Sequence, residues 1–287
     1  MQMIELNRDI LNQLHNDIDG LIGIFFSYNQ YTKIRSNTFH GLSQLAEINL
    51  SRNKLDSIEA ETFLGLENLI LIDLSYNQIP YLNANLFHDL TSLISIDFSY
   101  NQLSEIDAKT FHNLPNLTEL NLSGNQLRTL DQKTFVGLTS LKKIYLSYNK
   151  LNSIDTDIFF GLTNLNEIDL SYNKISSIYP RMFVGLTNLT KLHLSSNQIS
   201  SLDPDTFSNL FNLTKLYLFK NLISRLDMHI FEGLNKLTEV YLSGNKFNCD
   251  KLKLILEPNV KFFSFKRGLS DNDIESIITP DEVRLLT

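Results

Sequence analysis

The stretch 117–140, LTELNLSGNQLRTLDQKTFVGLTS, holds the pattern that decides the fold. In this 24-residue unit, leucine occupies positions 1, 4, 6, 11, 14 and 22, asparagine occupies position 9 and phenylalanine position 19. Polar and apolar residues alternate from Glu119 to Ser123, which predicts a short half-buried strand. Its leucines should point inward, and its three polar side chains, Ser123 among them, should point outward.

The unit recurs along most of the chain without a change of length. Asparagine returns every 24 residues from Asn29 to Asn245, and phenylalanine keeps the same step from Phe39 to Phe231. One unit is too small to bury its own apolar side chains, so stacked units must bury them against each other. We therefore expect a solenoid. Its asparagine column should satisfy buried backbone groups, and its phenylalanine column should fill the far side of each coil.

The pattern LxxLxLxxNxLxxLxxxxFxGLxx resembles the typical 24-residue leucine-rich repeat, over about residues 21–250. This subclass is found in the ectodomains of Toll-like receptors, Slit and chaoptin-like adhesion proteins. The resemblance implies an α/β fold, a right-handed parallel β-solenoid horseshoe of about ten 24-residue coils. It also implies a concave sheet that binds a protein ligand in a receptor or adhesion role, related to signalling or innate immunity.

The pattern divides the chain into three regions. Residues 1–20 form an irregular partial repeat, residues 21–248 form the solenoid, and residues 249–287 form a degenerate C-terminal cap with short helices. The segment around Cys249 keeps only part of the N-P-F-x-C-D-C cap motif of secreted relatives, since Lys246 and Lys251 replace the proline and the second cysteine. The run from Val260 to Phe265 could add an irregular strand.

Composition limits the partner and the compartment. The net charge of -7 argues against nucleic acid or an anionic membrane as the main partner. No apolar run approaches ~18 residues, so we expect no membrane insertion. The first residues lack the pattern of a signal peptide. We therefore expect an extracellular or cell-surface location as part of a longer precursor, and the alternative, if the chain is complete as written, is a cytoplasmic scaffold or adaptor.

The sequence contains no recognisable catalytic motif, so we predict no enzyme, no catalytic residue and no cofactor. His40, His88 and His112 each follow the consensus phenylalanine. His88 and His112 would lie on adjacent coils, but a variable surface position explains them better than a metal site. Cys249 fits a remnant of the cap better than a reactive thiol.

The outward strand positions have no folding role, so their identity is the best clue to binding. Positions 5 and 8 are rich in tyrosine, which is enriched at protein interfaces. The expected ligand-binding residues on the concave face are Tyr76, Tyr100, Tyr145, Tyr148, Tyr172, His193, Tyr217 and Tyr241. The members from Tyr145 onward form the favoured hot spot. Copying of a Ser-Tyr-Asn template during repeat duplication is the alternative explanation, and a homo- or heterodimer remains open.

Charge on these outward positions is uneven. The first five units have a net charge of -3, from Glu47, Asp73, Asp97, Glu119 and Arg52. The last five have +2, from Lys142, Lys143, Lys191, Lys215, Lys220, Glu167, Asp169 and Glu239. A partner with the opposite gradient would be oriented along the solenoid.

Five glycosylation motifs occur, at Asn49, Asn116, Asn121, Asn188 and Asn212. Each would mark a surface asparagine of a secreted protein. The repeat template itself generates Asn-Leu-Thr and Asn-Leu-Ser, so coincidence explains them equally well. Asn49 and Asn121 lie on the predicted strands, where a glycan would obstruct binding.

Overall fold

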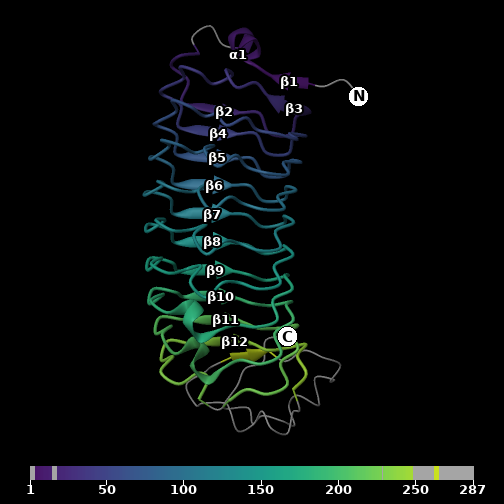
Figure 1. The fold of residues 1–287 in the computed structure, drawn as a ribbon, viewed down its shortest axis with the longest axis vertical. Helices are drawn as coiled ribbons and strands as arrows, with labels where there is room; N and C mark the ends of the chain where they lie inside the picture. Colours follow the sequence, from purple (N-terminus) through teal and green to yellow (C-terminus); the bar gives the residue numbers. More distant parts are fainter. Residues whose placement is uncertain (1–3, 15–17, 228, 248–261, 265–287) are drawn as a thin grey trace. The chain divides into compact units, whose positions relative to one another are not determined.

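The computed structural model describes residues 4–14, 18–227, 229–247 and 262–264. The chain forms two compact units, residues 1–150 and 151–287. Within each unit, consecutive coils each contribute one short strand to a parallel row (Figure 1). The predicted parallel β-solenoid is confirmed.

In the first unit, the strands pair in chain order with a constant register. Ile48 lies opposite Ile72, and every neighbouring pair along this row is offset by the same 24 residues. The strands of this row are β2 (Gly23–Phe25), β4 (Glu47–Asn49), β5 (Leu71–Asp73), β6 (Ser95–Asp97), β7 (Glu119–Asn121) and β8 (Lys143–Tyr145). The repeat length alone therefore sets the register.

The second unit continues the same arrangement with its own strands. They are β9 (Glu167–Asp169), β10 (Lys191–His193), β11 (Lys215–Tyr217), β12 (Glu239–Tyr241) and β13 (Phe262–Ser264), paired in that order. The strand β13 confirms the irregular strand expected in the tail. The helices expected in the cap, and Cys249, lie outside the described residues.

The remainder of each coil holds little regular structure, as expected. Most of it consists of turns, and the described residues of the second unit include two short 3-10 helices, η1 (Pro180–Phe183) and η2 (Pro204–Phe207). A proline begins each of these helices, where its missing N–H needs no partner. The Asp203 side chain accepts a hydrogen bond from the Asp205 N–H and caps η2.

The N-terminal residues depart from the repeat. They form β1 (Ile4–Leu6) and the helix α1 (Arg8–Leu14). The strand β1 pairs in parallel with β3 (Tyr31–Ile34), which follows the first asparagine of the repeat, and not with β2. In this region Leu11 is buried. The division into three regions stays a prediction.

The asparagine column has the predicted role. Asn149 is 7% exposed, and its Nδ2 donates to the carbonyl oxygens of Leu122, Leu146 and Ser147 at 2.9, 3.1 and 3.3 Å. Its Oδ1 accepts from the Leu127 N–H at 3.0 Å. One amide thus links two consecutive coils and satisfies the turn that leaves each strand.

The phenylalanine column is also where the repeat predicts it. All nine side chains from Phe39 to Phe231 are buried. In the first unit, the ring centroid of Phe111 lies 5.8 Å from that of Phe87 and 6.5 Å from that of Phe135. The column therefore forms a continuous apolar filling between coils.

Candidate functional site

In each unit, three positions of the coils form an exposed surface, which we call the strand face: positions 3, 5 and 8. In β7, β8, β10 and β11 the middle residue is fully buried, and the residues at positions 3 and 5 flank it with half-buried side chains. Position 8 follows in the turn. Positions 4 and 6 are buried in the core, so positions 3, 5 and 8 are the part of each strand and its turn that can vary with function.

The prediction that Ser123 points outward is wrong. Ser123 is 8% exposed, and the serines at the same position of other coils are similarly buried. Ser75 and Ser171 donate their hydroxyls to Asp73 and Asp169, two residues earlier on the strand, at 2.7 and 2.6 Å. The chain begins its turn at this position, so the strict alternation of a strand has ended.

Position 8 has a left-handed backbone in both units. The φ angles lie between 53° and 58° at Tyr28, Arg52, Tyr76, Tyr100, Tyr148, Tyr172, Ser196 and Lys220. Glycine occupies this position only at Gly124 and Gly244, with φ angles of 68° and 70°. A side chain in this conformation costs about 1 kcal/mol relative to glycine. The tyrosines therefore occupy a position where the fold would accommodate glycine without strain.

In the first unit the side chains at position 8 stack into one column, which we call the tyrosine ladder: Tyr28, Arg52, Tyr76 and Tyr100. The Arg52 guanidinium lies 5.1 Å from the ring centroid of Tyr28 and 4.0 Å from that of Tyr76. The rings of Tyr76 and Tyr100 stack at 4.4 Å with an interplanar angle of 11°. The tyrosine residues are 39% to 76% exposed, so their ring edges form an accessible surface.

Two carboxylates lie beside this ladder at position 5. Asp73 and Asp97 are partners in the register of β5 and β6. Burial raises the pKa of Asp97, the nearby charge of Asp73 raises it further, and hydrogen bonds from Ser99 and Asn121 oppose both effects. In the described part of the chain, neither carboxylate takes part in an ion pair.

In the second unit, aromatic side chains at position 5 of consecutive coils stack on one another. His193 stacks on Tyr217 with centroids 4.2 Å apart, and Tyr217 stacks on Tyr241 at 4.6 Å, with interplanar angles of 6° and 5°. All three side chains are only partly exposed. The three rings therefore form a partly buried stack.

Paired charges at position 3 surround this stack. Lys215 bridges to Glu239 at 2.7 Å, and Glu239 also accepts a hydrogen bond from the Tyr241 hydroxyl at 2.6 Å. That bond to the carboxylate raises the pKa of Tyr241 to about 12. Burial lowers the pKa of His193, although the charges of Asp169 and Glu167 oppose it. Lys191 and Lys215 thus pair with Glu167 and Glu239, and the net charge counted for this half, which already includes these carboxylates, is unchanged.

The structure brings together some of the predicted binding residues. Tyr76 and Tyr100 are in contact in the first unit, as are His193, Tyr217 and Tyr241 in the second. Tyr145 and Tyr148 lie in the coil of β8 in the first unit, and Tyr172 follows β9 in the second. Sequence reasoning missed Tyr28 and Arg52 as partners of the ladder. The sequence feature that could have revealed them is an arginine among tyrosines at position 8, since a guanidinium stacks on aromatic faces.

The glycosylation candidates fall into two groups. Asn116, Asn188 and Asn212 lie just before the strands, and each donates its Nδ2 to a carbonyl oxygen of the preceding coil, at 3.0, 2.9 and 2.7 Å. Asn49 and Asn121 lie on the strand face and accept hydrogen bonds from Ser51 and Ser123. Both groups have a structural role, which explains their recurrence without excluding a glycan.

Of the three histidines at the position after phenylalanine, His88 has a partner within its own coil, since its Nδ1 lies 2.8 Å from a carboxylate oxygen of Asp89. In the described ranges, no group of three or more His, Cys, Asp or Glu side chains could hold a metal ion.

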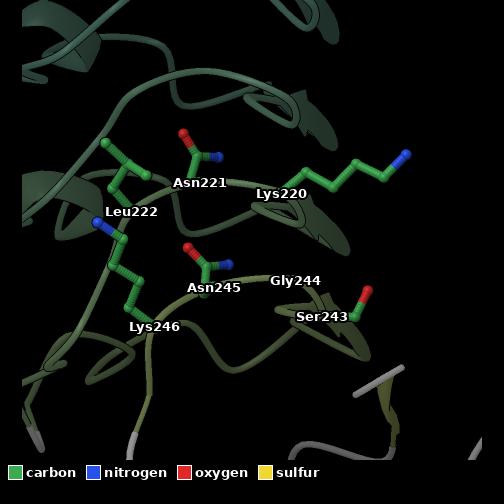
Figure 2. A pocket seen from close by; sticks show the side chains of 7 residues that line it. All are labelled: Lys220, Asn221, Leu222, Ser243, Gly244, Asn245 and Lys246. Atoms are coloured by element: carbon green, nitrogen blue, oxygen red, sulfur yellow. The ribbon is translucent and has the colours of Figure 1, made fainter. Parts of the chain in front are cut away.

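An open hollow of about 460 Å³ lies after β11 and β12, lined by two consecutive turns. Figure 2 shows that the side chains of Lys220 and Lys246 extend away from each other. The amides of Asn221 and Asn245 lie one beneath the other as members of the asparagine column. The lining residues are lysine, asparagine, leucine, serine and glycine, and they do not form an acid–base pair with a nucleophile.

Among the residues described, no helix is long and apolar enough to cross a membrane.

Coils of 24 residues, one strand each, with buried columns of leucine, asparagine and phenylalanine, define a repeat solenoid. The family model "Leucine rich repeat" matches residues 43–103, 95–151, 139–199 and 187–247. The chain therefore belongs to the leucine-rich repeat family, whose fold is generally a scaffold for binding.

Comparison with solved structures places receptor-type proteins among the neighbours. The chain is 30% identical to TLR13 in a "TLR13-ssRNA13 complex", with a TM-score of 0.76, and the match covers 91% of this chain but only 38% of the TLR13 chain. A leucine-rich repeat protein of Leptospira interrogans is 24% identical, with a TM-score of 0.69, over 99% of this chain and 76% of that one. The leucine-rich repeat domain of APL1B is 21% identical, with a TM-score of 0.71, over 91% and 74%. No curated protein matches.

Proposed function

We propose that this protein recognises a protein ligand through its strand face, in a receptor or adhesion role outside the cell. The observation that carries this proposal is the set of exposed tyrosine rings at left-handed positions, from Tyr28 to Tyr172. Each ring stands where glycine would relieve about 1 kcal/mol of backbone strain, so folding does not require it. Large rings with a polar tip are typical of protein-binding surfaces.

The charge of the strand face favours protein over nucleic acid. The TLR13 neighbour is a complex with ssRNA13, so RNA is the competing ligand class. In the first unit the carboxylates of Asp73 and Asp97 lie beside the ladder, and these would repel phosphate. In the second unit Lys191 and Lys215 are bound to Glu167 and Glu239. A phosphate backbone would therefore have to compete with these carboxylates for the two lysines.

The test removes tyrosines from the strand face. The double substitution Tyr145→Ala and Tyr172→Ala should abolish capture of the protein partner in a pull-down from the native compartment. The matched control is Tyr81→Ala with Tyr179→Ala, which removes two rings that are 56% and 52% exposed elsewhere. Capture that survives the first pair as well as the second would move the binding site off the strand face.

A cytosolic adaptor that uses the same face is the second candidate, favoured by the single cysteine, Cys249. Mass spectrometry of the natural protein separates the two. N-glycans on Asn116 or Asn188, whose side chains are exposed, would exclude the adaptor. Unmodified asparagines at every motif would favour it.

A further inference from the structure

Two neighbouring strands of the first unit carry aspartates at position 5 of the strand face. Asp73 and Asp97 are partners in the register of β5 and β6, and neighbouring strands lie ~4.8 Å apart. Both side chains are partly exposed, and within the described residues neither forms an ion pair. The Arg52 guanidinium, one coil earlier, stacks between the rings of Tyr28 and Tyr76 instead. Two like charges therefore lie side by side on an accessible surface.

The fold does not need a negative charge at this position. The Oδ1 atom of Asp73 accepts hydrogen bonds from the N–H and the hydroxyl of Ser75, at 3.0 and 2.7 Å. Asn49, at the same position of the preceding coil, accepts the same two bonds from Ser51 at the same distances. An uncharged amide therefore completes the turn equally well. The charge of Asp73 also raises the pKa of Asp97, which burial raises more strongly, so the pair of carboxylates costs stability that two amides would not.

Other carboxylates of the strand face have a lysine on the neighbouring strand. Glu119 pairs with Lys143 at 3.3 Å in the first unit, and Glu239 pairs with Lys215 at 2.7 Å in the second. A cation one strand spacing away thus reaches a carboxylate on this surface. The two aspartates have no such partner among the described residues, so their charge is complementary to a cation from another molecule.

Exposed apolar side chains border the two aspartates along the chain. Ile70 and Ile94 immediately precede β5 and β6, and both are exposed. The exposed rings of Tyr76 and Tyr100 follow the same strands. In the second unit, the position of these isoleucines holds threonines such as Thr214, whose hydroxyl donates to a carbonyl oxygen of the preceding coil at 2.9 Å. Since a polar residue satisfies the fold there, the isoleucines are apolar surface that folding does not require.

We infer that this part of the strand face docks a segment of a partner protein in which a lysine or arginine is flanked by apolar side chains. The cation binds to Asp73 and Asp97, and the flanking side chains pack on the rings of Tyr76 and Tyr100 and on the isoleucines before the strands. Such packing excludes water from the ion pair, which strengthens it. This inference rests on the proposed function and names the chemistry of the partner.

The experiment titrates the full chain into a dye-labelled peptide with blocked termini, Gly-Ser-Leu-Lys-Leu-Ser-Gly, and follows fluorescence anisotropy at low salt. Two companion peptides each lack one feature: methionine replaces the lysine in the first, and serine replaces both leucines in the second. We expect the lysine–leucine peptide to bind roughly 10-fold tighter than either companion. Equal affinity for the three peptides, or tighter binding of a uridine octamer, would overturn the inference.

The double substitution Asp73→Asn with Asp97→Asn tests the two charges. It keeps an acceptor for the turn, as the amide of the preceding coil does, and should weaken binding of the lysine–leucine peptide roughly 10-fold. Binding of the methionine peptide should not change. The control is Asp107→Asn with Asp131→Asn, which removes the same charge from two exposed turn residues outside the strand face. Their Oδ1 atoms accept a backbone N–H, as that of Asn83 does. Equal weakening by the control would show an effect of net charge alone and overturn the inference.

Partner capture separates this inference from the proposed function. If Tyr145→Ala with Tyr172→Ala abolishes capture but Asp73→Asn with Asp97→Asn does not, this docking surface is wrong and the proposed function stands. If no strand-face variant affects capture, both are wrong. Loss of capture in the aspartate variant as well, with a melting temperature that is not lowered, supports both. Self-association of the chain that the aspartate variant abolishes would make a second copy the occupant and overturn the inference.

Discussion

Replacing Asn149 with leucine tests the asparagine column most directly. The amide makes two short bonds to a neighbouring part of the solenoid: Nδ2 to the Leu122 carbonyl at 2.9 Å, and Oδ1 from the Leu127 N–H at 3.0 Å. Leucine has a similar shape but can make neither bond. The Leu122 carbonyl and the Leu127 N–H would then be buried without a partner, and each such group costs about 1–3 kcal/mol.

The sum for Asn149→Leu is thus a loss of about 2–5 kcal/mol in the free energy of unfolding, after a small gain from burying the leucine. Urea denaturation followed by circular dichroism measures it. The control is Asn29→Leu at the same position of the first coil, where the asparagine is exposed and donates only to Phe26 and Ser27. We expect that loss to stay below about 1 kcal/mol. Equal losses for the two variants would refute the role of the column.

Two further predictions concern the core and the charged stack. Phe111→Ala should lower the free energy of unfolding by about 3–5 kcal/mol, because the ring is fully buried between Phe87 and Phe135; a loss near that of a surface change would contradict the stacked column. Although burial raises the pKa of Glu239, bonds from Lys215 and Tyr241 lower it overall from 4.5. This group therefore stabilises the fold above pH 4.5, and that contribution is lost as the pH falls through the lower folded-state pKa. Tyr241→Phe should raise the Glu239 pKa in an NMR titration; an unchanged value would mean that the hydroxyl does not hold the carboxylate.

The buried positions of the repeat could be predicted from the sequence because the 24-residue period determines which residues face the core. A buried position recurs every 24 residues whatever its neighbours are, so the asparagine and phenylalanine columns follow from spacing. Ser123 shows the limit of that reasoning. Alternation predicts it outward, but the chain has already begun to turn, and the side chain is buried.

The outward half could be predicted only as a set of residue types. The sequence shows tyrosine at positions 5 and 8, and the alternation of polar and apolar residues predicts that both lie on the exposed surface of a strand. Position 8 is a left-handed turn residue whose rings stack in the first unit, and position 5 is stacked in the second. A charge count likewise gives only the net charge of each half, whereas the structure shows that Lys215 pairs with Glu239.

The sequence by itself therefore determined the solenoid, its register and its buried columns, because one strict period leaves each unit a single way to bury its leucines. Only the tertiary structure decided which exposed side chains meet. Arg52 lies between Tyr28 and Tyr76, and the Tyr100 ring lies over Gly124, because stacking brings residues 24 apart within ring-contact distance. Those contacts depend on backbone angle and side-chain direction, which composition and spacing do not specify.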